Sequence, residues 1–509
     1  MIDARVTIHP DLVVGPVNRR LFGSFVEHLG RCVYDGIYEP GHPTADEHGF
    51  RSDVVGLVRE LGVTTVRYPG GNFVSGYRWE DGVGPREQRP RRLDLAWHST
   101  ETNEIGLDEF AGWLKRVDAE LMYAVNLGTR GVLDALAVLE YANIRSGTTL
   151  SDARVANGHP EPHDIRVWCL GNEMDGPWQL GHGTAAEYAR IAAQTASAMR
   201  QVDPDLELVV CGSSGAQMPT FGEWERVVLE ATYDDVDYIS CHAYYEPDGD
   251  DYGSFLASAV DMDRFIEEVA ATADHVKARK HSDKTMRISF DEWNVWYMTR
   301  YNEVDKITDV QTWPVAPRLL EDSYSVMDAV VFGNLLISLL RHADRVTAAS
   351  LAQLVNVIAP IMTEPGGPAW RQTTFFPFSI TSRLARGSSL DLTIQSPTYD
   401  TAQHGEAALV DAVATHDAQT GEIAVFAVNR SLTEEAAFHI DTGALGAVEV
   451  VSATSLHDED IHAANTLADP ERVAPRENSS VRIGAEGIGI TLPPVSWTAI
   501  SLRTQAAAA

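Results

Sequence analysis

The sequence predicts a (β/α)8 barrel joined to an antiparallel β-sandwich. Two observations lead to this fold class. Between residues 19 and 387, short apolar runs alternate with helical patterns, and eight of these runs are strand candidates. From residue 388 onward the helical periodicity stops, and short strands follow one another with only turns between them. Strands that alternate with helices over this length are typical of a closed parallel barrel, and closely spaced short strands are typical of a sandwich.

The chain begins with a strand that has no helix after it, at residues 4–8, followed by a second apolar patch at 12–17. A strand without a following helix does not fit the barrel pattern, so we expect it to pair into the sandwich. The predicted domains are therefore a barrel at 19–387 and a sandwich made of 1–18 and 388–503. Residues 504–509 are predicted to be a disordered tail.

The barrel elements follow in order along the chain. The predicted strands are 21–25, 64–68, 121–125, 165–170, 206–210, 236–240, 286–290 and 348–351. The helices between them are predicted at 54–61, 107–117, 132–142, 185–202, 224–231, 262–279 and 324–340, of which the last is the most apolar. Gly62 and Asp203-Pro204 close two of these helices, as glycine and proline commonly do. Residues 297–317 are predicted to form a long polar loop.

The sandwich strands are predicted at 390–395, 407–415, 422–429, 447–453, 481–483, 488–492 and 497–502. This domain could be a separate binding module. Trp497 is its one tryptophan, however, and an exposed row of aromatic residues is missing from the pattern. We therefore favour a structural role for the sandwich.

Composition excludes several classes of partner. The formal net charge is −33, which argues against binding to nucleic acid or to an anionic membrane. The first residues lack a basic start and a long apolar run, so we expect no signal peptide, and no apolar run is long enough to span a bilayer. None of the four cysteines has CxxC spacing, which fits buried free thiols in a reducing compartment, and we expect a cytoplasmic protein.

Motifs for cofactors are missing as well. The sequence has no HExxH, no Cys/His cluster, no strand-bound GxGxxG and no GxxxxGK[ST], so neither a metal nor a nucleotide cofactor is predicted. Four histidines, His28, His98, His182 and His242, are interpreted as ordinary loop or core residues rather than as metal ligands.

Two glutamates stand out by their position. Glu173 follows the strand 165–170 and opens a loop rich in Gly, Pro and Trp, and Glu292 follows the strand 286–290 beside two indoles. Catalytic groups of parallel barrels lie at the carboxyl ends of the strands. By strand order these are the fourth and the seventh strand, which lie across the barrel mouth from each other. A pair of carboxyls facing one another is the arrangement found in glycosidases. The distance between the two carboxyls decides whether the anomeric configuration of the sugar is retained or inverted, and the sequence does not give this distance.

Longer stretches around these glutamates resemble a known family. Residues 171–179 and 291–296 together resemble the α-L-arabinofuranosidases of glycoside hydrolase family 51, and the similarity extends in order to residues 23–28, 67–72, 93–97, 101–104 and 242–245. The resemblance covers about residues 20–360. It implies a retaining, exo-acting α-L-arabinofuranosidase that needs no cofactor. Its expected substrates are arabinan, arabinoxylan or arabino-oligosaccharides, and members of the family often form hexamers, so a homo-oligomer is expected.

The resemblance also implies roles for individual residues. Glu173 would be the general acid/base and Glu292 the nucleophile, with Arg67 and Tyr244 beside Glu292 to keep it ionised and oriented. Asn172 would bind the sugar's 2-hydroxyl group. The remaining implied contacts to the sugar are Glu27, Asn72 and Gln353 for its other hydroxyls, and Trp97, Trp178 and Trp296 for its subsite walls. We expect the loop 297–317 to shape the aglycone side of the site.

Other interpretations remain open from sequence alone. Glu27 and Arg67 could form structural ion pairs, and the aromatic residues could be ordinary wall packing. The barrel could act on a β-xyloside or a β-glucan, because related barrels share the carboxylate pair. A non-catalytic carbohydrate-binding protein is the alternative from a different class, and the presence of both Glu173 and Glu292 argues against it.

Overall fold

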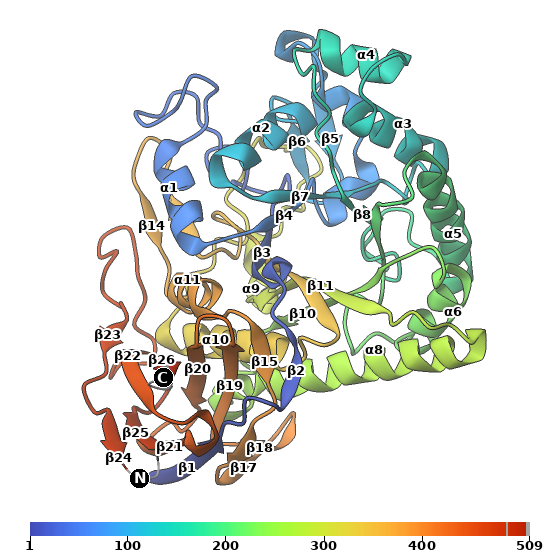
Figure 1. The fold of residues 1–509 in the computed structure, drawn as a ribbon. Helices are drawn as coiled ribbons and strands as arrows, with labels where there is room; N and C mark the ends of the chain where they lie inside the picture. Colours follow the sequence, from blue (N-terminus) through green and yellow to red (C-terminus); the bar gives the residue numbers. More distant parts are fainter. Residues whose placement is uncertain (485–486, 505–509) are drawn as a thin grey trace.

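The computed structural model describes residues 1–484 and 487–504 and confirms the predicted fold class (Figure 1). Eight parallel strands close into a barrel in the cyclic order β3-β4-β7-β8-β9-β10-β11-β12. Their bounds are Gly23–Phe25, Thr65–Tyr68, Glu120–Ala124, Val167–Leu170, Glu207–Val210, Tyr238–Tyr245, Arg287–Val295 and Val346–Ala352. Each predicted barrel strand is therefore present, and Glu173 and Glu292 come from the fourth and the seventh strand.

Helices surround this barrel (Figure 1). They are α1 (Ser52–Leu61), α2 (Leu107–Val117), α3 (Val132–Asn143), α5 (Ala185–Val202), α6 (Glu223–Thr232), α8 (Ser258–Lys280) and α10 (Val326–Arg341). Further helices that were not predicted are α4 (Thr149–Ala156), α7 (Tyr252–Leu256) and α11 (Phe375–Leu384). In the part of the chain that the structure describes, no helix combines the length and the apolar character needed to cross a bilayer.

Two barrel strands are longer than predicted, and one of them, β11, carries a bulge against both of its neighbours. β10 continues past Ser240 and β11 past Phe290, and the register between them shifts between Ser240 and His242. On the side of β11 that faces β12, Phe290 pairs with Ala349 and Trp293 pairs with Leu351. Three residues of β11 therefore advance along only two residues of β12. A bulge inserts an extra residue and re-aims side chains, as often happens beside active sites. Neighbouring residues of a regular strand face opposite sides, and this bulge lets Asp291 and Glu292 both contact the same guanidinium group, that of Arg67.

The sandwich consists of two sheets, in the orders β16-β1-β21-β25-β24 and β2-β15-β19-β20-β26-β22-β23. The first strand, β1 (Ile2–Thr7), pairs with β21 (Ala436–Asp441), a strand that was not predicted. The predicted strand 390–395 is wrong as one element. It divides into β15 (Ser388–Leu390) and β16 (Thr393–Gln395), which belong to different sheets, because Asp391 and Leu392 between them carry the chain across.

The other strands of these sheets are β2 (Val13–Pro16), β19 (Val410–Asp417), β20 (Glu422–Asn429), β22 (Val448–Leu456), β23 (Arg476–Glu477), β24 (Arg482–Gly484), β25 (Gly487–Leu492) and β26 (Ser496–Thr504). A small hairpin of β17 (Thr398–Thr401) and β18 (Gly405–Ala408) stands beside them. The predicted tail lies outside the described residues, except for Thr504, which ends β26.

Helix α10 joins the two domains. It is apolar on all sides and buried along almost its whole length, as a helix enclosed on every face must be. Its Gly333 lies against the indole of Trp497 on β26, where a Cβ atom would approach the ring to 2.3 Å, so only glycine fits there. Asn334 on the same helix donates to Asp411 of β19 at 2.8 Å. Trp497 is thus an interface residue rather than an exposed sugar-binding aromatic.

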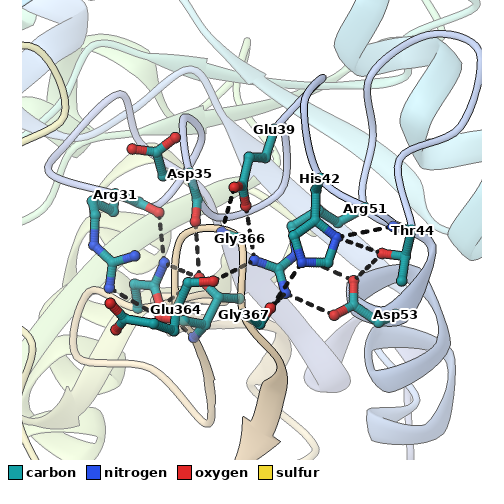
Figure 2. Close-up of polar contacts among 12 residues, drawn as sticks. Arg31, Asp35, Glu39, His42, Thr44, Arg51, Asp53, Glu364, Gly366 and Gly367 are labelled. Carbon is teal, nitrogen blue, oxygen red and sulfur yellow. Dashed lines mark hydrogen bonds and ion pairs between the residues drawn. The ribbon is translucent and has the colours of Figure 1, made fainter.

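A polar cluster fastens the hairpin of β13 (Ile361–Thr363) and β14 (Ala369–Arg371) to the loop that follows β3 (Figure 2). Arg51 is fully buried at its centre, paired with Glu39 at 2.9 Å and with Asp53 at 2.7 Å. It also donates to the carbonyls of Glu364 and Gly367 in the hairpin. The cluster therefore holds together two segments that lead into the barrel mouth, those carrying Glu27 and Gln353.

Candidate active site

Glu173 lies three residues beyond the end of β8, in a tight turn. Gly171 has φ +94° and Glu173 itself has φ +42°, a left-handed conformation that costs an L-residue roughly 1–2 kcal/mol. Backbone strain of this kind is common at functional sites. The turn aims the carboxylate into the barrel mouth, where it accepts hydrogen bonds from Nε1 of Trp178 at 2.6 Å and from Nδ1 of His242 at 2.9 Å.

Glu292 faces it from β11. One of its oxygens accepts from Arg67 at 2.7 Å, and the other accepts from the hydroxyl of Tyr244 at 2.7 Å. An oxygen of Glu173 and an oxygen of Glu292 lie within 4.8 Å of each other. Retaining glycosidases hold their carboxyls about 5–5.5 Å apart, and inverting ones about 6.5–9.5 Å apart. The short separation fits the retaining arrangement.

His242 connects the two glutamates. Its Nδ1 is 2.9 Å from Glu173 and 3.7 Å from Glu292, and its Nε2 is 2.9 Å from Asp291. Burial disfavours the charged ring, but the surrounding carboxylates outweigh burial and raise the pKa of His242 to about 10. An imidazolium donates from both nitrogens, which matches the two short contacts. From sequence, this histidine is interpreted as an ordinary loop or core residue, whereas the structure places it between the two glutamates.

Arg67, on β4, supplies the second cation. Its guanidinium group bonds Glu292 and the side-chain oxygen of Asn172, each at 2.7 Å, and lies 3.6 Å from Asp291. These contacts leave the Asn172 amide nitrogen directed toward Asn72 and Gln179, at 3.5 and 3.3 Å. Arg67 thus fixes the orientation of both Glu292 and Asn172.

The charged groups of the site come close to balancing one another. The cluster holds two cations, Arg67 and His242, and three carboxyls, so one proton on a carboxyl makes it neutral. Asp291 and Glu292 both face Arg67, whereas Glu173 does not. Burial raises the pKa of Glu292, and the nearby His242 and Arg67 oppose that rise. Glu292 and Asp291 thus each lie beside both cations, whereas Glu173 contacts only one of them, His242.

The two glutamates open into a pocket of about 540 Å³. Nine of the eleven predicted site residues line it: Glu27, Asn72, Trp97, Glu173, Trp178, Tyr244, Glu292, Trp296 and Gln353. The other two, Arg67 and Asn172, are buried and contact Glu292 or Asn72. The structure therefore brings all eleven residues together.

Glu27 forms one wall of the pocket. It accepts from the backbone of Phe73 at 2.8 Å and from Nε1 of Trp97 at 2.9 Å, and its second oxygen lies 3.4 Å from the amide of Gln353. Burial, with a smaller contribution from the charge of Glu292, raises the pKa of Glu27 to about 8. The alternative interpretation, in which Glu27 forms an ion pair with an arginine, is therefore wrong, because the partners of Glu27 among the described residues are these neutral groups.

Aromatic side chains form the rest of the wall. The rings of Tyr244 and Trp296 meet edge to face with centroids 5.1 Å apart, and Tyr301 packs on both Trp296 and Trp97 at 6.0 Å. Tyr301 belongs to the predicted loop 297–317, which begins with two short helical turns, α9 (Met298–Arg300) and η5 (Tyr301–Asp305). From sequence, this loop is expected on the aglycone side, but Tyr301 is not singled out, because nothing local distinguishes it from other loop tyrosines.

Glu173, His242 and Glu292 are also the one group among the described residues whose ligand atoms come close enough to surround a metal ion. Their mutual contacts favour another use. A metal requires a free lone pair on the imidazole, and both nitrogens of His242 face carboxylates as donors. We therefore interpret the cluster as one that holds protons.

Comparisons with known proteins agree with this geometry. Residues 57–263 match the family described as Alpha-L-arabinofuranosidase 1 domain, and residues 291–496 match the Alpha-L-arabinofuranosidase C-terminal domain. The chain is 63% identical to the intracellular exo-α-(1→5)-L-arabinofuranosidase of Streptomyces lividans, over 98% of this chain and 75% of that protein. The chain belongs to the α-L-arabinofuranosidases of glycoside hydrolase family 51.

Other members of the family differ in the linkage that their names give. The exo-α-(1→6)-L-arabinofuranosidase of Bifidobacterium longum is 59% identical, over 98% of this chain and 97% of that protein. Among solved structures, a family 51 α-L-arabinofuranosidase from Bifidobacterium longum is 50% identical, with a TM-score of 0.94, over 98% of this chain and 99% of that one. The arabinose complex of the Thermotoga maritima α-L-arabinofuranosidase has a TM-score of 0.85 at 32% identity, over 98% of this chain and 99% of that one.

Proposed function

We propose that this protein is a retaining, exo-acting α-L-arabinofuranosidase that releases terminal arabinofuranosyl residues by double displacement. The observation that supports this most strongly is the pair Glu173 and Glu292, whose oxygens lie within 4.8 Å across a pocket of about 540 Å³. The names of the family relatives support the sugar and the exo action.

In the first step, an oxygen of Glu292 attacks the anomeric carbon of the arabinofuranosyl unit. The bond from that carbon to the glycosidic oxygen breaks, and Glu173 gives its proton to the departing oxygen. The products are a glycosyl ester on Glu292 and a free alcohol. Arg67 and Tyr244 hold Glu292 in one orientation, so the attacking oxygen needs little rearrangement.

In the second step, Glu173, now ionised, takes a proton from water while the water oxygen attacks the same carbon. The ester bond breaks, Glu292 regains its charge, and the configuration of the sugar is retained. His242 keeps its own charge throughout and stabilises whichever glutamate is negative, because its Nδ1 lies near both.

The substrates are arabinofuranosyl oligosaccharides and the side chains or ends of arabinan and arabinoxylan. The names of the relatives include both (1→5) and (1→6) linkages, so linkage preference is to be measured for this chain. The relatives named intracellular support a cytoplasmic enzyme that acts on imported oligosaccharides. We also propose domains at 19–387 and at 1–18 with 388–503, no required cofactor, and a homo-oligomer, a hexamer by analogy with the family.

A panel of aryl glycosides tests this proposal. The α-L-arabinofuranoside should be preferred over the β-D-xyloside, β-D-glucoside and β-D-galactoside by about tenfold or more in kcat/KM, or roughly 1.4 kcal/mol of transition-state discrimination. A preference for one of the pyranosides would keep the two glutamates in their roles and overturn the substrate assignment.

A further inference from the structure

We propose that the sugar chain attached to the scissile oxygen, the aglycone, binds in a groove that leaves the catalytic pocket past Trp178. We call it the Leu95–Leu180 groove, after the two side chains on its banks. It offers sites for at least two sugar units beyond the bond that is cut. This inference rests on the proposed function and specifies the substrate as an oligosaccharide rather than a small glycoside.

The groove is continuous with the pocket. An adjoining cavity of about 290 Å³ shares Asn72, Ala96 and Trp178 with the catalytic pocket. That cavity in turn shares Phe73, Gly76, Asp94, Leu95 and Leu180 with a third cavity of about 750 Å³. Because each cavity shares wall residues with the next, the three cavities form one path. A single arabinofuranosyl unit would occupy only the catalytic pocket and would leave the two further cavities empty.

The chemistry of bond cleavage selects this direction. The proton donor Glu173 must face the departing oxygen, so the aglycone lies on the Glu173 side of the sugar. The loop that begins at Glu173 forms one bank of the groove with residues 177–182, and Trp178 on this loop donates its indole N–H to Glu173. A chain that extends from the scissile oxygen therefore passes over Trp178 and enters the groove.

The surface of the groove suits an uncharged sugar chain. Trp178, Leu95 and Leu180 are 52%, 62% and 39% exposed, and such apolar surfaces can pack on the C–H faces of sugar rings. The polar groups are close to electrically balanced. Arg92 pairs with Asp81 at 2.8 Å and Arg130 with Glu80 at 2.6 Å, so they offer N–H and carboxylate groups to hydroxyls with little net charge. A charged ligand would find little net attraction at these pairs.

Gly76 gives a way to block the groove without touching the catalytic pocket. It is exposed on the groove floor, does not line the catalytic pocket and does not have a left-handed backbone. A Cβ atom there would meet only a methyl group of Leu180, at 3.7 Å. Gly76→Leu therefore fills the groove with little strain. Gly41→Leu is the matched control, because a Cβ atom at Gly41 meets nothing within 4 Å and Gly41 lines none of the three cavities.

The test compares kcat/KM for an aryl α-L-arabinofuranoside, arabinobiose and arabinotetraose. In the wild-type enzyme, kcat/KM should rise by about tenfold from the biose to the tetraose, as expected when further sugar units make contacts. Gly76→Leu should abolish this gain and change the aryl rate less than about twofold. Leu95→Ser, which removes an exposed apolar wall, should lower the gain in the same direction, and Gly41→Leu should keep it.

The groove would be overturned by a wild-type enzyme indifferent to chain length or by a Gly76→Leu variant that keeps the full gain. Met218 lines the catalytic pocket but neither of the two further cavities, so if Met218→Trp removes the gain instead, the aglycone leaves past Met218 and the groove is wrong. Failure of the wild type on the aryl substrate would count against the proposed function. In that case the groove is tested by calorimetry, which measures the binding of arabinotetraose and arabinobiose to Glu292→Ala and to Glu292→Ala/Gly76→Leu. Equal affinities of Glu292→Ala for the two sugars would reject the groove.

Discussion

Nδ1 of His242 lies 2.9 Å from the carboxylate of Glu173. Its Nε2 is equally close to Asp291, and the ring lies near Glu292 as well. One buried cation thus contacts the proposed acid/base, and the same cation lies within reach of the proposed nucleophile. Since the pKa of His242 is raised to about 10, this charge is present across the neutral pH range.

Replacing His242 should move the acid limb of the pH profile. The positive ring opposes the rise in the pKa of Glu292, so its removal lets that pKa rise further. We expect His242→Asn to shift the acid limb of kcat/KM upward by about one pH unit and to lower the maximum by about tenfold or more. An unchanged acid limb in the variant would show that His242 does not act on the ionisation of Glu292. His182→Asn, which changes a histidine that lines the groove but lies outside the cluster, is the control.

Trp178→Phe should impair proton transfer to poor leaving groups. The variant keeps an aromatic ring and loses the 2.6 Å hydrogen bond to Glu173. We expect kcat/KM to fall by about tenfold on an aryl α-L-arabinofuranoside with a poor leaving group, and to fall less on one with an activated leaving group, because an activated leaving group needs less protonation. Equal losses on the two aryl substrates, whose aglycones are alike in size, would mean that Trp178 serves binding alone.

Glu27→Gln should change how stability depends on pH. Burial raises the pKa of Glu27 from 4.5 to about 8 in the folded protein. A carboxyl with a raised folded pKa stabilises the fold fully below its unfolded pKa, and this contribution is lost as the pH rises toward 8. The Tm of the variant relative to wild type should therefore increase between pH 5 and 8 and level off above that. A Tm difference that stays constant from pH 5 to 9 would contradict the raised pKa.

Arg51→Ala should destabilise the protein without touching the catalytic pocket. Arg51 is fully buried and paired with two carboxylates, which its removal would leave uncompensated (Figure 2). Breaking a buried pair from one side costs about 3–5 kcal/mol. We expect a clear fall in Tm by calorimetry, whereas Arg190→Ala on the exposed side of α5 should leave Tm nearly unchanged. A Tm for Arg51→Ala within the error of the control would show that the cluster is not needed for stability.

Much of the fold could be predicted because periodicity is local. The eight barrel strands follow from apolar runs, and α5 was predicted with its exact residues because an Ala-rich stretch begins after Thr184 and stops at Asp203-Pro204. β21 was missed because its apolar residues alternate with polar ones over only six positions. The extension of β10 and β11 past Ser240 and Phe290 could not be predicted, because bulges depend on pairing with neighbours that lie far away in sequence.

The same distinction applies to the site. Glu173 and Glu292 could be identified from strand ends, since position along a strand is a local property. The role of His242 could not, because it depends on three carboxylates that come from two other strands. Trp97 was predicted as a wall residue, and the structure adds that its indole N–H also bonds Glu27, a contact across 70 positions of the chain.

The roles of the two glutamates are tested most directly by azide rescue. Glu173→Ala should be slow on oligosaccharides but should still form the glycosyl ester from an activated aryl α-L-arabinofuranoside, and azide should restore turnover. The product should be α-L-arabinofuranosyl azide, identified by NMR, because azide attacks an ester formed on Glu292 with inversion. The β-azide from this variant, or no rescue together with an equal loss on both substrates, would contradict the assignment of Glu173 as acid/base and Glu292 as nucleophile.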